Sequence, residues 1–114
     1  MAETLGTFEQ AVLLALARPL TELGKEAYGR AILKEVELRI GHEVAAGAVY
    51  ATLERLEAKG FISSELEQGN AARAGRPRRH YSIEPSGIRA LNESRAAVER
   101  IWASAPWPLK GTAQ

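Results

Sequence analysis

Apolar residues recur at helical spacing in three successive stretches of the chain. In the third stretch, residues 44–60, Val49, Leu53 and Leu56 form one stripe, and Gly60 follows as a residue type that commonly ends helices. The opposite face carries mostly small side chains, with one phenol and one guanidinium. The pattern predicts a short amphipathic helix whose outer face is either solvated, as in most such helices, or binds a partner closely.

Two helices are predicted upstream of it. Thr7 and Gln10 have the spacing of a capping box before an apolar helix over residues 8–17. This helix is apolar on nearly every side, so it needs contacts with the core and with a further surface. A second helix is predicted over residues 26–40, ended by Gly41. With the third helix it has the arrangement of a helix-turn-helix, although an ordinary helical hairpin shows the same pattern.

A β-hairpin is predicted after the third helix. Residues 61–67 and 79–83 read as two strands, and the second alternates in the manner of a half-buried strand. The segment between them contains Gly, Pro and Asn, which favour an irregular tip. Three helices followed by a hairpin have the order of a winged helix-turn-helix domain, which we assign to residues 1–84. The predicted fold class is therefore mainly α with a small β-hairpin.

Residues 85–105 predict a fourth helix, with Pro85 at a position suited to the first helical turn. Its apolar positions follow a heptad pattern too short for a free-standing coiled coil. A lone helix cannot bury this stripe, so we predict a C-terminal dimerisation helix and a homodimer; the alternative is a fourth helix packed on its own domain. Residues 106–114 are predicted to be a disordered tail because they are rich in Pro and Gly.

The candidate dimerisation residues lie on this stripe and on the first helix. They are Phe8, Leu91, Val98, Ile101 and Trp102. Trp102 has two interpretations, because an aromatic ring near a two-fold seam either packs in the dimer core or contacts a ligand. A planar, apolar small molecule held between two Trp102 rings is therefore a candidate effector.

Composition narrows the class of function. The 114 residues include no cysteine and no aspartate, and the two histidines are isolated. Disulfides, thiolate metal sites and a cysteine nucleophile are excluded, and no phosphate-binding loop or metal-ligand spacing occurs. We therefore predict no enzyme, no catalytic or metal site and no cofactor. The longest apolar run, residues 11–17, is too short to span a membrane, so a soluble, cytoplasmic protein is expected.

Charge is unevenly distributed although the net charge is only +1. Residues 70–82 contain no acid and carry four arginines: Arg73, Arg76, Arg78 and Arg79. This cationic segment coincides with the predicted hairpin tip, in a form suited to phosphates and to the narrow minor groove of A·T-rich DNA. Double-stranded DNA is therefore the predicted partner, and a merely solvated basic loop is the alternative.

The outer face of the third helix supplies further candidate DNA contacts: Gly47, Tyr50, Ala51 and Arg55. The two small residues allow close approach to the major groove, Tyr50 can donate to a phosphate, and Arg55 can pair with guanine. Two glutamates on the same helix repel phosphate. The basic hairpin is therefore predicted to supply general affinity, and the helix sequence preference.

Three segments together resemble the PadR-family transcriptional regulators. They are EAYGRAILKEV at 26–36, GAVYATLERLEAKGFI at 47–62 and RRHYSI at 78–83, and the resemblance extends over roughly residues 8–102. The single C-terminal helix resembles the short branch of that family. The resemblance implies a homodimeric repressor, often one that releases DNA on binding a small molecule. A winged-helix protein-interaction module without DNA binding remains the alternative, because fold alone does not determine function.

Two residues depart from the family pattern. Ala45 stands where the family usually caps the third helix with Ser or Thr, and Glu84 stands where it usually has Thr. An alanine cap is weaker by about 1 kcal/mol, so the start of the third helix is expected to fray until DNA phosphates order it. The departures bear on affinity more than on function, because neither residue lies on the predicted binding face.

Overall fold

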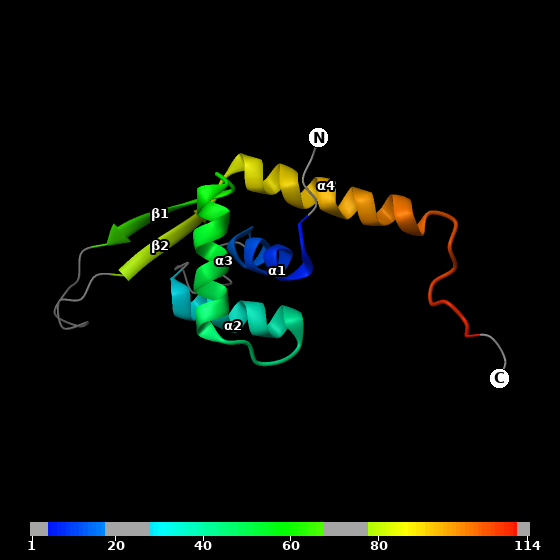
Figure 1. The fold of residues 1–114 in the computed structure, drawn as a ribbon, viewed down its shortest axis with the longest axis horizontal. Helices are drawn as coiled ribbons and strands as arrows, with labels where there is room; N and C mark the ends of the chain where they lie inside the picture. Colours follow the sequence, from blue (N-terminus) through cyan, green and yellow to red (C-terminus); the bar gives the residue numbers. More distant parts are fainter. Residues whose placement is uncertain (1–4, 18–27, 68–77, 112–114) are drawn as a thin grey trace.

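The computed structural model describes residues 5–17, 28–67 and 78–111. Figure 1 shows a bundle of helices with a hairpin extending on one side and a long helix on the other. The described elements are α1 (Thr7–Ala17), α2 (Gly29–Ile40), α3 (Ala46–Ala58), β1 (Ile62–Glu67), β2 (Arg78–Ile83) and α4 (Pro85–Trp102). This order confirms the predicted fold class, mainly α with a small hairpin and a winged-helix arrangement.

The core surrounds α1, which contacts α2, α3, α4 and β2. Five of its residues are buried, whereas Leu14 remains partly exposed. The other core side chains at zero exposure come from α2 and α3: Ile32, Val36, Val49, Leu53 and Leu56. The central position explains why α1 is apolar on nearly every side, since the chain itself surrounds most of it. Phe8 packs, partly buried, against this core.

The structure confirms that Gly41 and Gly60 follow the ends of α2 and α3. It corrects the predicted starts of α1 and α2 and the predicted end of α4. Gly41 has φ 94° and its N–H donates to the Glu37 carbonyl, and Gly60 has φ 82°. After α3 the Gly60 N–H donates to Glu57 and the Phe61 N–H to Leu56, which is a Schellman motif. These backbone bonds satisfy carbonyls that the helix end leaves open.

The capping box predicted at Thr7 and Gln10 is wrong by one residue. Thr7 already lies in α1, and the Gly6 N–H donates to Glu9 Oε1 at 3.1 Å instead. Gln10 Nε2 donates to the Leu5 carbonyl at 2.9 Å. A glycine can stand before the first helical turn, so the acid three residues later takes the role predicted for Gln10.

α2 begins later and α4 ends earlier than predicted. Tyr28 is extended, with φ −94° and ψ 161°, and pairs with His80 in an isolated bridge. α2 therefore starts at Gly29; the predicted first residues, 26 and 27, lie outside the described part of the chain. α4 ends at Trp102 and not at Ala105, because Ala103 leaves the helical conformation. Ala45 precedes α3 without a side-chain cap hydrogen bond, as the sequence predicted.

The two strands form an antiparallel hairpin. Ile62 pairs with Ile83, and Glu67 pairs with Arg78 at the other end. Ile62 and Tyr81 are buried and attach the hairpin to the bundle. The tip, with Arg73 and Arg76, lies outside the described residues.

The first half of α4 is fixed to its own domain. The Glu84 N–H donates to the Phe61 carbonyl at 2.9 Å, and Ser86 Oγ donates to the Gly60 carbonyl at 2.6 Å. Gly87 and Ser94 are buried, and Ser94 Oγ accepts from the Leu5 N–H at 3.1 Å. The second half, residues 95–102, has no buried residue and extends away from the bundle (Figure 1). No helix in the described part of the chain combines the length and apolarity needed to cross a bilayer.

Candidate nucleic-acid interface

α3 exposes a face that carries mostly small side chains. Val49, Thr52, Leu53 and Leu56 are buried on its inner side. Gly47, Ala51, Glu54 and Ala58 are exposed and follow the i, i+4, i+7, i+11 spacing of the opposite side. A side chain built at Gly47 would meet nothing within 4 Å, so the space outside this helix is open.

Tyr50 lies on the flank of this face that adjoins the hairpin and is seated on α2. Its ring and hydroxyl occupy the space that a Cβ at Gly29 would need, while 46% of the residue stays exposed. The glycine at the first position of α2 therefore determines where Tyr50 lies. The packing gives a reason for glycine at position 29, since a larger residue would displace the phenol.

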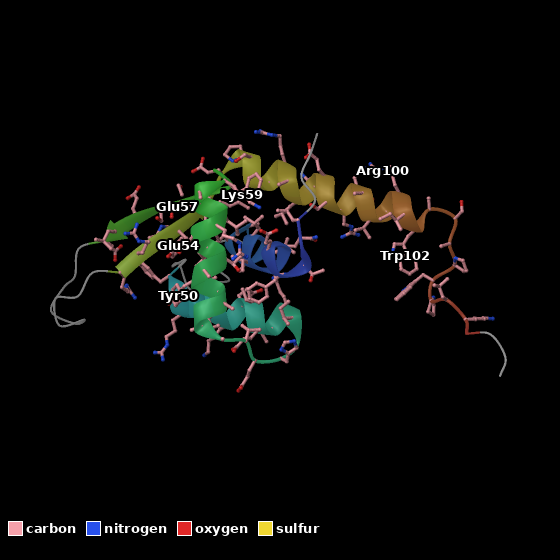
Figure 2. All side chains as sticks on the ribbon, in the orientation of Figure 1. Tyr50, Glu54, Glu57, Lys59, Arg100 and Trp102 are labelled. Carbon is pink, nitrogen blue, oxygen red and sulfur yellow. The ribbon has the colours of Figure 1, made fainter. Side chains whose placement is uncertain are left out.

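A hollow of about 540 Å³ separates α3 from β2. Figure 2 shows Tyr50, Glu54 and Glu57 along α3 beside the hairpin. The residues lining the hollow are Gly47, Tyr50, Ala51, Glu54, Glu57, Arg79 and Tyr81. The structure thus brings four predicted DNA contacts from two elements onto one surface, namely Gly47, Tyr50, Ala51 and Arg79.

Two hydrogen bonds in series hold the Arg79 side chain at the edge of this hollow. Its Nη1 donates to Ser64 Oγ at 3.0 Å, and that hydroxyl donates to Glu57 Oε2 at 2.8 Å. Burial raises the pKa of the Tyr81 hydroxyl, and the carboxylates of Glu57 and Glu54 add to the rise, while Arg79 opposes it. The phenol therefore stays protonated at neutral pH and remains a hydrogen-bond donor.

Arg78 is turned toward the body of the domain. Its guanidinium carbon lies 3.7 Å from the centroid of the Tyr28 ring, and Nη2 lies 3.9 Å from Glu67 Oε1. The Tyr28 hydroxyl donates to Glu67 Oε2 at 2.6 Å, and its ring meets His80 edge to face at 5.5 Å. These contacts attach the end of the two strands next to the tip to the start of α2. Arg78 thus has a structural position whether or not it also reaches DNA.

Arg55 lies on the other flank of α3. Helical spacing places it about 80° from Gly47 and on the side away from Tyr50. Its Nη2 donates to Thr52 Oγ1 at 3.2 Å, and the side chain is exposed and does not line the hollow beside the hairpin. Arg55 and Arg79 therefore bracket the outward face from opposite sides.

Arg30 is a basic residue that the sequence interpretation missed. It is exposed in the first turn of α2 and lines a second hollow, of about 370 Å³, together with Tyr50, Arg78 and Arg79. The first turn of α2 contains no acid. A cation at a helix N-terminus opposes the helix dipole. With the helix start predicted at residue 26, Arg30 fell in the second turn, so this unfavourable placement carried no signal in the sequence.

The predicted dimerisation residues lie mainly on the second half of α4. Val98, Ile101 and Trp102 are 43%, 79% and 39% exposed, and Leu91 is half-buried. The sequence assigned no contact to Trp107, yet its ring packs edge to face on Trp102 with centroids 5.4 Å apart. A hollow of about 660 Å³ adjoins the two rings and reaches Val98 and Ala105. Among the described residues, no three metal-ligating side chains are grouped to hold an ion.

Comparisons with known proteins agree with this architecture. The model of the transcriptional regulator PadR-like family matches residues 19–93. The transcriptional regulator Rv3488 of Mycobacterium tuberculosis is 40% identical over 76 residues, which are 67% of this chain and 66% of that protein.

Solved structures show the same fold. A PadR family regulator from Eggerthella lenta has 30% identity and a TM-score of 0.59, over 79% of this chain and 72% of its own. A PadR-like regulator from Bacillus cereus has 20% identity and a TM-score of 0.66, over 94% of this chain and 95% of its own. The family model covers more than half of the sequence, and the winged-helix arrangement is shared with these relatives. The chain therefore belongs to the PadR-like family of transcriptional regulators.

Proposed function

We propose that this protein is a homodimeric, sequence-specific DNA-binding repressor that acts in the cytoplasm on the chromosome. The observation that carries the proposal is the continuous surface formed by the outward face of α3 and Arg79 of the hairpin, around one hollow. A helix with small outer residues fits the major groove, and a basic hairpin beside it fits the adjoining phosphates. Family membership and the relative named as a transcriptional regulator support the same function.

In this proposal, residues 1–84 form the DNA-binding domain and the α4 region, residues 85–105, supplies the dimer contact. Gly47 and Ala51 approach the groove floor, Tyr50 donates to a phosphate, and Arg55 pairs with guanine. Arg79 contacts phosphate, Arg78 both anchors the hairpin and adds positive charge, and Arg73 and Arg76 at the tip extend the contact. The two α3 helices of the dimer must stand about 34 Å apart to enter successive major grooves.

Regulation by a small molecule completes the proposal. A planar, apolar effector binds beside Trp102, where the hollow next to the ring offers Val98 and Ala105 as apolar lining. Binding there changes the separation of the two α3 helices. DNA affinity then falls only by the difference in the effector's affinity for the two dimer shapes, and DNA weakens effector binding by the same factor.

The test is the salt dependence of DNA binding by wild type and Arg79→Ala. Fluorescence anisotropy with a selected operator and with random DNA gives the affinity across a range of salt concentrations. Loss of one phosphate contact should weaken binding to both DNAs and reduce the salt slope by about one unit. The matched control is Arg89→Ala, an equal change of charge at an exposed position of α4 off the apolar stripe. An equal loss in both variants, or no salt-sensitive binding by wild type, would contradict the proposal.

A further inference from the structure

Glu54 occupies the centre of the outward face of α3. Ala51 and Ala58 flank it one turn away and Gly47 lies two turns before it, and all three are exposed and small. Within the described part of the chain, no hydrogen bond or ion pair engages its carboxylate. Glu57, on the flank toward the hairpin, differs because its carboxylate accepts from Ser64 Oγ at 2.8 Å. Glu54 therefore presents a carboxylate where an approaching surface meets α3 first.

A carboxylate at this point lowers the affinity for DNA unless a base replaces the hydrogen bonds to water that the carboxylate loses on binding. It repels phosphates, and at a base edge it loses water that only a hydrogen-bond donor can replace. In the major groove the amino groups are N4 of cytosine and N6 of adenine, whereas guanine and thymine present acceptors. A carboxylate, which has acceptors only, is therefore repelled by guanine and thymine edges.

Cytosine suits a carboxylate better than adenine does. The adenine amino group stands between two acceptors, N7 of the same base and O4 of the paired thymine. The cytosine amino group has the O6 acceptor of the paired guanine on one side only. A carboxylate approaching from the other side meets the donor with less repulsion, so the discrimination extends to adenine as well.

The neighbouring side chains leave Glu54 available for this contact. Arg79, the cation that shares its hollow, directs Nη1 to Ser64 Oγ, and Arg55 directs Nη2 to Thr52. The small residues beside Glu54 let the helix approach closely enough for a short side chain to reach a base edge. Base contact and phosphate contact are thus separated on this surface, with the carboxylate central and the guanidinium groups at the flanks.

We propose that Glu54 is a specificity-determining residue that accepts a hydrogen bond from the amino group of a cytosine in each half-site of the operator. The assignment rests on the proposed DNA-binding function. It adds a residue that recognises cytosine to Arg55, which is proposed to recognise guanine. Its expected contribution is discrimination of about 5- to 100-fold against the other three bases at that position, the range typical of one mismatched pair.

The test compares Glu54→Gln with wild type, using selection from a randomised DNA library followed by affinities for the four base variants of the selected site. Wild type should select cytosine at one position of each half-site. Glutamine keeps the size and adds an amide donor that pairs with adenine N7 and N6, so the variant should shift that position to adenine. It should also bind random DNA more tightly, because one repulsive charge is removed.

Glu57→Gln is the matched control, with the same change of charge and size one turn along α3. It should raise affinity for all DNAs and leave the base preference of wild type unchanged. If Glu54→Gln alters affinity for every sequence equally, as Glu57→Gln does, Glu54 is not a base reader, while DNA binding stands. If wild type shows no preference for any sequence, the proposed function itself fails and this assignment fails with it. Thermal unfolding of both variants checks that the fold is intact.

Discussion

The surface around α3 and the second half of α4 are both exposed, but they differ in what holds their side chains. Around α3, Tyr50 is seated on Gly29 and Arg79 is hydrogen-bonded to Ser64, so contacts within one chain set the geometry. Along residues 95–102 of α4, apolar side chains such as Ile101 extend beyond the bundle, 79% exposed. The first surface is complete in a single chain and polar enough to meet DNA. The second is apolar and exposed, and in the proposed homodimer a second copy covers it.

The two halves of α4 also differ in whether contacts within the chain hold their side chains. The first half is packed through Gly87, Ala90 and Ser94 against the domain, which corresponds to the alternative of a helix serving its own fold. The second half corresponds to the predicted dimerisation helix. A helix that does both can transmit a change at the dimer contact to the DNA-binding surface, because its first turn is hydrogen-bonded to the turn after α3.

The largest expected effect is on dimerisation. Val98→Glu places a carboxylate in the proposed apolar contact, and burying an unpaired charge costs several kcal/mol, enough to dissociate a small dimer. Sedimentation should show wild type as a dimer at micromolar concentration and the variant as a monomer. Arg89→Glu introduces the same residue off the stripe and should remain dimeric. A wild type that is monomeric under these conditions would refute the dimer.

A smaller effect is expected where α4 meets its own domain. A Cβ at Gly87 would overlap the Phe61 carbonyl and crowd Ile83, and backbone there cannot move aside as a flexible side chain can. Gly87→Ala should therefore lower the free energy of unfolding by about 1–3 kcal/mol. Gly47→Ala, in open space, should not lower it. Thermal unfolding of both variants measures the difference, and equal stability would show that α4 is not fixed at this point.

The smallest expected effect concerns the aromatic site. Trp107 packs on Trp102 at 5.4 Å, so Trp107→Phe leaves a single reporter and a similar ring contact. A planar aromatic ligand should quench the fluorescence of Trp102, with each ring contact adding roughly 0.5–1.5 kcal/mol. The same ligand should lower the affinity for DNA. No quenching by any member of a panel of planar aromatics, in a variant that still dimerises, would leave Trp102 with a packing role alone.

The parts of the fold that local signals determine could be predicted from the sequence. Apolar spacing located the helices, Gly41 and Gly60 marked two ends, and Pro85 marked the start of α4, because each acts on its nearest neighbours. Contacts between distant residues could not be predicted in this way. Tyr28 meets Arg78 and His80 about fifty positions later, and nothing near Tyr28 indicates this pairing.

For the candidate site, too, the local features could be predicted from the sequence, and the contacts between distant residues could not. Helical spacing alone separated the outward residues of α3 from the core, and the basic character of the hairpin was visible as charge. Arg30 was missed because the second helix was interpreted only through its apolar stripe, although the structure brings it beside Tyr50. Trp107 was missed because its proline-rich surroundings suggested no contact, whereas packing on Trp102 is a tertiary contact.

The most direct test of the central claim is to map the amide chemical shifts that change when the protein binds a selected operator. We expect the largest changes in residues 46–58 of α3 and 78–83 of β2, with small changes in residues 95–102 of α4. Deletion of Tyr50's ring by Tyr50→Ala should reduce the changes at the start of α2. Changes concentrated on α4, with α3 and β2 unaffected at saturating DNA, would contradict the assignment of the two surfaces.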